Sequence, residues 1–418
     1  MEPPPQTQAA LPSKYIQAGT RAFWRVNIAL VAAAFCTFAL IYCVQPLMPV
    51  LAAVFKVTPA ESSLSLSVTT GLLAIGMLAS GIASEMLRRK PLMATSLFAS
   101  ALLTLGTAIA PNWHLLLLTR VLVGLAISGL PAVAMAYVSE EIDPASGGLA
   151  MGLYIGGTAF GGMTGRLVTG VITDLLSWRW AIGIIGGLAV CGSILFLVLL
   201  PPSRQFTPRS PNFEQLKSSL SSHFHDRGLL LLFSMGFLLM GSFVSVYNYL
   251  GFRLMAPPYY FSQTAVGLLF TVYSVGMFSS AWAGHMAAHR GRRTVLFGMV
   301  MLMGAGVLIT MAHATWAVLF GLAVMTFGFF GAHTVVSAWI GIRAHSAKAV
   351  ASSFYLFCYY AGSSVVGTFA GTFWSTKGWL GVTAIVGVLL ILALAVVFAL
   401  RNLPTAQDIA PFSETPAV

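Results

Sequence analysis

The sequence predicts an all-α polytopic membrane protein with about twelve transmembrane helices. Of its 418 residues, 57% are hydrophobic and only 8% are charged, whereas about a quarter of the residues in a soluble domain are charged. Apolar runs of bilayer-spanning length, about 20 residues, recur along the chain, for example at 24–44, 92–110 and 379–400. Composition and recurrence together exclude a soluble protein.

Proline, glycine and charged residues interrupt the apolar runs and mark the ends of the helices. The predicted helices are, in chain order, 24–50, 62–86, 91–110, 114–138, 146–173, 179–200, 228–252, 264–287, 294–312, 315–342, 346–373 and 378–401. A long polar segment follows the sixth helix and divides the chain. The predicted regions are a tail at 1–23, a six-helix half at 24–200, a central loop at 201–227, a second six-helix half at 228–401 and a tail at 402–418.

The cations indicate how the chain is oriented in the membrane. The formal net charge of +11 arises from short loops between apolar runs rather than from one basic surface, so nucleic acid is not a predicted partner. Most cations fall in the loops of one side, and the other side holds only Lys56, Arg179, Arg253 and Lys377. The positive-inside rule then places both termini and the central loop in the cytoplasm. We expect a monomeric, multi-pass protein of the inner membrane.

No enzymatic motif is found in the sequence. Cys36, Cys43, Cys191 and Cys358 lie far apart in apolar segments, without the close spacing of a metal or redox motif. His285 and His289 stand four residues apart but have no third ligand nearby in the sequence, and no phosphate-binding loop of an ATP-driven pump is present. We therefore predict no catalytic residue, no metal and no cofactor.

An internal repeat relates the two halves. The segment GIASEMLRRKPLM at 81–93 resembles GHMAAHRGRRTVL at 284–296, 203 residues later. Four further residues match at a constant offset of 201: Tyr154, Gly161, Gly170 and Trp178 with Tyr355, Gly362, Gly371 and Trp379. Two parallel, pseudo-symmetric halves of six helices each explain these matches.

The repeated loop resembles the signature G-x-x-x-D-x-x-G-R-[RK] of the Major Facilitator Superfamily. The first copy has Glu85 in place of the Asp and Arg88 in place of the second Gly, and the second copy has Ala288 in place of the Asp. The matching residues are Gly81, Arg89, Lys90, Gly284, Gly291, Arg292 and Arg293. In physical terms, we expect the first glycine to permit a close helix contact and the cations to lie among the lipid headgroups. A topology signal alone would explain the cations equally well, but not the glycines.

Two further helices resemble family signatures. The fourth helix contains Arg120 and Gly124 in the spacing R-x-x-x-G. The fifth contains a stripe of glycines, Gly157, Gly161 and Gly165, similar to the glycine-rich signature of the family's antiporters. It departs from that signature at Gly162, which replaces a proline, and at Arg166. The stripe predicts tight helix packing.

The resemblance implies a central cavity between the halves, lined mainly by helices 1, 4, 7 and 10. Polar residues on the lining helices are the candidates for substrate contact. They are Tyr42, Gln45, Arg120, Arg166, Tyr247, Asn248, Tyr249, His333, Ser337, Tyr355, Tyr359 and Tyr360. Neighbouring residues diverge by about 100° around a helix, so not all of them face inward. Alternatives are interfacial tyrosines and, for Asn248, a helix-to-helix hydrogen bond.

The ionisable residues indicate which group could couple transport to proton movement. All eleven carboxylates fall in tails, loops or helix ends, so no acid is available at mid-membrane to carry a proton. His333 is then the candidate proton carrier, and Arg120 and Arg166 are candidate charges that regulate a proton site. The alternative for His333 is a neutral histidine that forms a hydrogen bond to a neighbouring helix. For the two arginines, the alternative is snorkelling to the surface or pairing with Glu61 or Asp174.

These observations predict a secondary active transporter that works by alternating access in the lipid bilayer. The preferred function is proton-linked efflux of a small organic or amphipathic solute, as implied by the resemblance to a drug and sugar efflux branch of the family. Exchange or uptake of an anion such as an organic acid is an alternative, favoured by the two buried arginines. A receptor that binds without transport is a third, which the lack of any soluble signalling domain disfavours.

Overall fold

The computed structural model describes residues 15–206, 221, 223–344 and 348–402, with the side chains of 81–85, 349 and 402 left undescribed. The elements of the first half are α1 (Arg21–Tyr42), η1 (Gln45–Leu47), α2 (Met48–Phe55), α3 (Pro59–Met86), α4 (Arg89–Ala108), α5 (Trp113–Ile127), α6 (Pro131–Glu141), α7 (Pro144–Leu175) and α8 (Trp178–Leu199). Those of the second half are α10 (Arg227–Met255), α11 (Gln263–Leu268), η2 (Leu269–Val272), α12 (Tyr273–Arg290), α13 (Arg292–Ile309), α14 (Thr315–Arg343), α15 (Lys348–Ala399) and η3 (Leu400–Asn402). Parts of both predicted tails and of the central loop lie outside the described residues.

The described helices account for the predicted number of membrane crossings. Ten stretches of the described residues are long and apolar enough to span a bilayer. One of them lies in α15, which contains two helices joined at Gly378, where a φ of +56° interrupts the helical geometry. The glycine-rich α7, with 32 residues, is long enough to add a further crossing although it is not among the ten. The all-α polytopic fold is confirmed.

Three predicted helices are interrupted where the sequence analysis expected continuity. One of them, 264–287, passes from α11 through η2 into α12, and the other two contain proline. The predicted helix 24–50 ends as an α-helix at Tyr42 and continues as η1 and α2, and 114–138 is divided between α5 and α6. Proline explains both breaks: Pro46 lies in η1 and Pro131 opens α6. Proline has no N–H for the helical hydrogen bond, and its ring clashes with the preceding turn.

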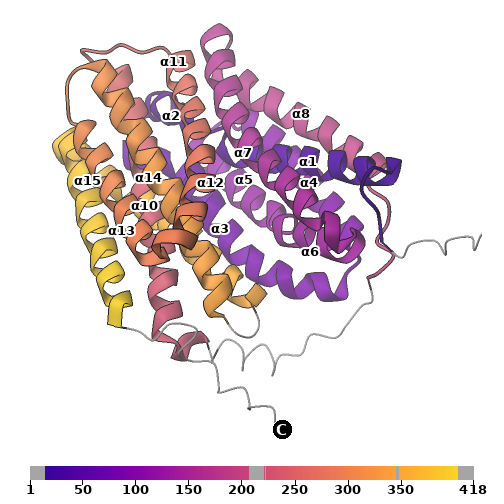
Figure 1. The fold of residues 1–418 in the computed structure, drawn as a ribbon. Helices are drawn as coiled ribbons and strands as arrows, with labels where there is room; N and C mark the ends of the chain where they lie inside the picture. The colour runs from indigo at the N-terminus through magenta and orange to yellow at the C-terminus, as the bar shows by residue number, and fades with distance from the viewer. Residues whose placement is uncertain (1–14, 207–220, 222, 345–347, 403–418) are drawn as a thin grey trace, which may run out of the picture.

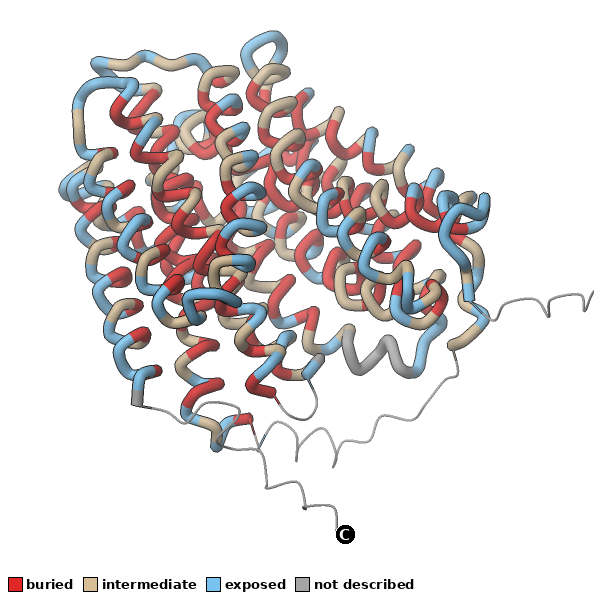
Figure 2. Tube along the Cα trace, viewed as in Figure 1, coloured by how far each residue is buried: buried red, intermediate tan, exposed pale blue. Residues whose placement is uncertain are grey.

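The two halves meet at one end of the bundle. Figure 1 shows that the first-half helices incline strongly to those of the second half, approach them around α7 and α11, and diverge toward the end at which α15 stops. We name these the far end, which holds α2 and the start of α11, and the terminal end, which holds Arg89, Arg343 and η3. Contacts between the halves join α3 to α15, α7 to α11, and η1 and α2 to α10. Figure 2 shows buried residues concentrated along the inner faces of each group of helices.

The internal repeat is visible in the packing. A Cβ added to Gly161 on α7 would collide with the carbonyl oxygen of Phe35 on α1, and one added to Gly362 on α15 would collide with that of Phe237 on α10. Gly157 and Gly165 lie against α1 in the same way, at Val31 and Ala39. The glycine stripe of the fifth helix therefore brings two backbones into direct contact.

The glycines of the repeated loop do not share this packing. The side-chain surroundings of Gly81 and Glu85, in the last turns of α3, lie outside the described residues. Gly284 on α12 is exposed, and a Cβ there would meet only Thr334 Cγ2, at the ordinary van der Waals distance of 3.7 Å. The close helix contact expected at Gly284 is therefore wrong.

Valine substitutions should distinguish these two kinds of glycine. We expect Gly161→Val to lower the free energy of unfolding by about 1–3 kcal/mol or more, because the side chain would overlap a backbone carbonyl. Gly284→Val should change it by about 0.5 kcal/mol or less, as an exposed substitution usually does. Thermal unfolding of both variants in detergent measures the difference, and equal melting temperatures would contradict the packing described for Gly161.

Candidate functional site

A buried polar network joins three helices between the two halves. Gln45 is the first residue of η1, three residues after the last residue of α1, at the break that Pro46 causes. Its Nε2 donates a hydrogen bond to Asn248 Oδ1 on α10 over 2.8 Å. Its Oε1 accepts from Nε of Arg166 on α7 over 2.7 Å. One glutamine side chain thus links both halves, and the helix-to-helix hydrogen bond considered for Asn248 is present.

Arg166 is the charged member of the network and is only 2% exposed. Its Nη1 donates to the carbonyl oxygen of Gly162, one turn earlier, over 2.8 Å. The rings of Tyr42, Phe270 and Tyr273 lie 4.0, 4.7 and 4.9 Å from its Cζ, distances at which ring faces attract a cation. Its Nη2 forms no hydrogen bond with the residues that the structure describes. One face of the guanidinium fork therefore remains available for an acceptor.

Neither carboxylate proposed as a partner reaches Arg166 or Arg120. Asp174 instead accepts hydrogen bonds from the backbone N–H groups of Gln263 and Thr264 at the start of α11, over 3.1 and 2.7 Å. Glu61 accepts from the backbone and the hydroxyl of Thr58, over 2.7 and 2.9 Å. Both acids satisfy helix N-termini, which leave N–H groups unpaired.

Arg120 has a different environment from Arg166. It is fully buried, and its three nitrogens each donate to a backbone carbonyl: Nε to Ser65 on α3 over 2.9 Å, and Nη1 and Nη2 to Leu40 and Ile41 on α1 over 3.0 and 2.7 Å. The last carbonyls of a helix lack partners within it and carry partial negative charge. Arg120 therefore caps the end of α1, and these contacts do not support the substrate-facing role expected for it.

Aromatic side chains of the second half surround the network. The hydroxyl of Tyr247 on α10 is hydrogen-bonded to Thr326 Oγ1 on α14 over 2.8 Å, and its ring stacks on Phe270 with centroids 5.3 Å apart. One turn away, Phe243 stacks on Phe329 at 3.9 Å. Phe270, 4.7 Å from Arg166 Cζ, connects the Tyr247 ring to the guanidinium.

A histidine lies further along α14. Nδ1 of His333 is 2.6 Å from the hydroxyl of Tyr355 on α15, within hydrogen-bond distance. The Tyr359 ring lies 4.9 Å from the imidazole. Ser337, one turn nearer the terminal end, is exposed. The structure thus brings His333, Tyr355 and Tyr359 together. Phe329 and Phe243 connect this cluster to the rings around Arg166.

The adjacent tyrosines face different neighbours, as the helical geometry requires. Tyr249 turns toward α15, where its hydroxyl donates to the carbonyl of Gly367 over 2.8 Å. Tyr360 is buried, and its ring stands perpendicular to that of Tyr359. Tyr249 therefore takes part in the packing of α10 against α15.

Each half contains an ion pair at the terminal end, but only the pair of the first half involves the loop motif. Arg89 is bound by both oxygens of Glu140 on α6, over 3.1 and 2.6 Å, and lies over the Phe206 ring. Arg343 pairs in the same way with Asp226 in the second half. Gly291 has a φ of +82°, which explains a glycine there. Lys90, Arg292 and Arg293 are half-buried.

Sequence reasoning missed the partners that come from other helices. Phe270 and Tyr273 fall in the predicted helix 264–287 but were not singled out, and Glu140 was not linked to Arg89. The spacing of three between Phe270 and Tyr273 places both on one helical face, which was the available signal. Their meeting with Arg166 depends on how α7 packs against η2.

Comparisons with known proteins agree with this fold. A profile described as Major Facilitator Superfamily matches residues 30–260. The MFS-type transporter YybF of Bacillus subtilis is 47% identical over 91% of this chain and 94% of its own length, and the inner membrane transport protein YnfM of Escherichia coli is 47% identical over 92% of each. A bacterial homologue of the human lysosomal transporter Spinster, solved in an inward-facing conformation, superposes with a TM-score of 0.77 at 13% identity, covering 95% of this chain and 100% of the other.

The likeness to Spinster shows the fold alone, whereas the two bacterial relatives are similar in sequence over nearly their whole length. All of them are transporters rather than enzymes. The buried network between two helical halves, the doubled loop motif and these relatives lead to one conclusion: the chain is a multi-pass membrane protein of the Major Facilitator Superfamily, a secondary transporter of small molecules.

Proposed function

We propose that this transporter moves a small organic anion and that Arg166 binds the anionic group. The observation that supports this is a guanidinium that is 2% exposed, bound to neutral partners, with Nη2 unpaired among the described residues. A buried charge is costly unless it is paired. A carboxylate on the substrate would supply both the missing charge and an acceptor for the fork.

The surroundings of Arg166 favour an apolar or aromatic body on that anion. Tyr42, Phe270, Tyr273 and Tyr247 provide ring faces and edges beside the guanidinium. Such rings pack well against a planar or apolar group. The substrate class is therefore a small organic acid with a hydrophobic body, rather than an inorganic anion.

Transport proceeds by rocking of the two halves, 24–200 and 228–401, about this network. The contacts between the halves lie at the far end, and the helices diverge toward the terminal end. With the cation-rich terminal end in the cytoplasm, the arrangement opens inward. Separation of the far end would require the bond between Gln45 and Asn248 to break.

Transport into proteoliposomes tests this proposal. The purified protein should exchange a radiolabelled aromatic carboxylic acid and should not exchange the matched primary amide, which has nearly the same shape without the charge. A panel of acids of increasing apolar size defines the preferred body. Equal transport of acids and amides, or of neither, would contradict an anionic substrate.

A second candidate, proton-linked efflux, is favoured by the His333–Tyr355 pair. Within the described membrane spans, His333 is an ionisable group at hydrogen-bond distance from a second side chain that can donate or accept a proton. If it carries the coupled proton, His333→Gln should preserve folding and abolish most of the pH dependence of transport. The pH profile of uptake, compared with that of Ser337→Ala, measures this. An unchanged profile would exclude His333 from coupling.

A further inference from the structure

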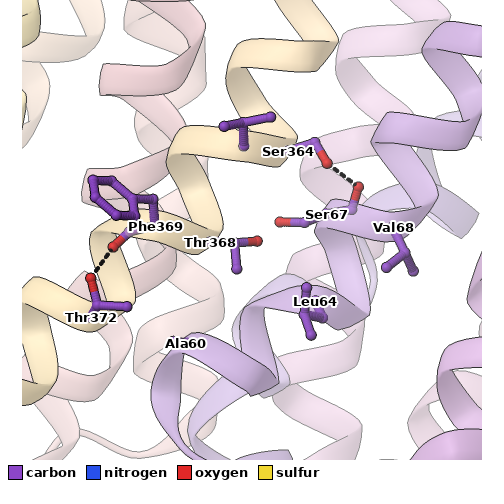
Figure 3. A pocket seen from close by; sticks show the side chains of 9 residues that line it. Ala60, Leu64, Ser67, Val68, Ser364, Thr368, Phe369 and Thr372 are labelled. Atoms are coloured by element: carbon purple, nitrogen blue, oxygen red, sulfur yellow. Dashed lines mark hydrogen bonds between the residues drawn. The ribbon is translucent and has the colours of Figure 1, made fainter.

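The outer surface of the contact between α3 and α15 is hollowed into a groove. It has a volume of about 440 Å³, and α3 contributes Ala60, Leu64, Ser67 and Val68 to its walls, while α15 contributes Ser364, Val365, Thr368, Phe369 and Thr372. The two walls come from different halves of the protein. Figure 3 shows the groove between the two helices, with Leu64 and Phe369 on opposite sides.

The groove faces the bilayer. Val365 and Phe369 are 59% and 53% exposed, although they lie within a stretch of α15 that is long and apolar enough to span a membrane. On α3, Ile75 is also exposed, two turns beyond Val68 along the same face. Large apolar side chains exposed at this depth contact lipid rather than water. The molecules that reach the groove are therefore those dissolved in the membrane.

The floor of the groove contains hydrogen-bonding groups without partners. Ser67 is 2% exposed, and its Oγ has no hydrogen-bond partner; the same is true of the buried Oγ1 of Thr368. Figure 3 shows these two hydroxyls pointing toward one another across the groove. By contrast, Ser364 donates to the carbonyl of Ser67 over 2.6 Å, and Thr372 donates to that of Phe369 over 2.8 Å.

Unpaired buried hydroxyls are unusual because each costs free energy, more so where no water can reach it. A molecule with only hydrocarbon in the groove would leave both unpaired. A molecule with a hydroxyl could accept from one of them and donate to the other, while its hydrocarbon body covers Leu64, Val365 and Phe369. The two hydroxyls thus match the polar head of an amphipathic molecule, and the apolar walls match its hydrocarbon body.

We propose that this groove is a second binding site, separate from the arginine network, for an uncharged, hydroxyl-bearing amphipath that enters from the bilayer. Its head group lies between Ser67 and Thr368, and its apolar chain extends over the exposed side chains of α15. The site binds no charge, so it does not depend on the anionic substrate proposed above, and either proposal can fail without the other.

Photolabelling in phosphatidylcholine nanodiscs tests the site. The probe is a long-chain primary alcohol with a diazirine in its chain, and the matched probe is the same chain without the hydroxyl. Mass spectrometry locates the labelled residues. We expect the alcohol to label groove residues on both α3 and α15 about five to ten times more than the hydrocarbon, the effect of one or two additional hydrogen bonds.

Three variants sharpen the test. Ser67→Ala combined with Thr368→Val should remove the preference for the alcohol without destabilising the protein, because neither hydroxyl has a partner to lose. Thr372→Val removes a hydroxyl of the same groove that is already hydrogen-bonded, so this variant should keep the preference for the alcohol. Val365→Trp should fill the groove and prevent labelling by both probes. Equal labelling by alcohol and hydrocarbon, or a preference that survives the double substitution, would overturn the proposal and leave ordinary contact with lipid chains.

Discussion

Replacement of Arg166 by glutamine is expected to weaken binding of an anionic substrate by about 30-fold or more. Removing one member of a buried charge pair costs about 2–5 kcal/mol, and about 2 kcal/mol corresponds to a factor of about 30 in the dissociation constant. The affinity of Arg166→Lys for the acid should lie between those of the unaltered protein and Arg166→Gln. Lysine retains the charge but not the planar fork that reaches Gln45 and a carboxylate together. Isothermal titration of an aromatic carboxylic acid into the purified proteins measures the three affinities.

The control for this result is an arginine that caps a helix far from the network. Arg179 donates to the carbonyls of Ala108 and Ala110 at the end of α4, over 3.1 and 2.9 Å. Arg179→Gln should leave the affinity for the acid unchanged. If Arg166→Gln binds the acid as tightly as the unaltered protein while folding normally, the cation of Arg166 does not hold the substrate.

A valine at Gly371 should shift the protein away from the arrangement described here. A Cβ at this position would collide with Cα of Ala60 and the hydroxyl of Tyr249, at the contact between α15 and α3. Overpacking costs about 1–3 kcal/mol. Tyr249 belongs to the same half as Gly371, so its overlap remains in both conformations, whereas the overlap with Ala60 is absent once the halves separate at the far end. A cost of about 2 kcal/mol from the Ala60 overlap would change the ratio of the two conformations about 30-fold. Transport should fall accordingly, since neither conformation may dominate during a cycle.

The shift can be measured as a distance across the far end. Spin labels attached at Val54 and Thr376, both exposed and in different halves, should move apart in Gly371→Val in a background without native cysteines. Gly387→Val, in the second helix of α15, is the control, because a Cβ there meets nothing within 4 Å. An identical label distance in both variants would show that α3 and α15 do not form a closing contact.

The parts of this structure that sequence reasoning predicted are those set by local pattern. The span lengths follow from apolar runs, and the spacing of Gly157, Gly161 and Gly165 follows from the helical period. The partners of Arg120 were not predictable, because they are backbone carbonyls that become available only where α1 stops before Pro46. The aromatic surroundings of Arg166 depend on the contact between α7 and η2, which no local pattern encodes.

The repeat also explains an asymmetry in the central network. Gln45 and Asn248 are 203 residues apart and occupy corresponding places in the two halves, where they bond to each other. The residue that corresponds to Arg166, at the offset of 201 that relates Gly161 to Gly362, is Gly367. A Cβ at Gly367 would lie only 3.1 Å from Val244 Cγ1 and 3.3 Å from Asn248 Nδ2, so a side chain corresponding to that of Arg166 has no room there. At these corresponding positions only the first half carries a cation. The function proposed above therefore predicts a single orientation for an asymmetric solute, with its anionic end toward the first half.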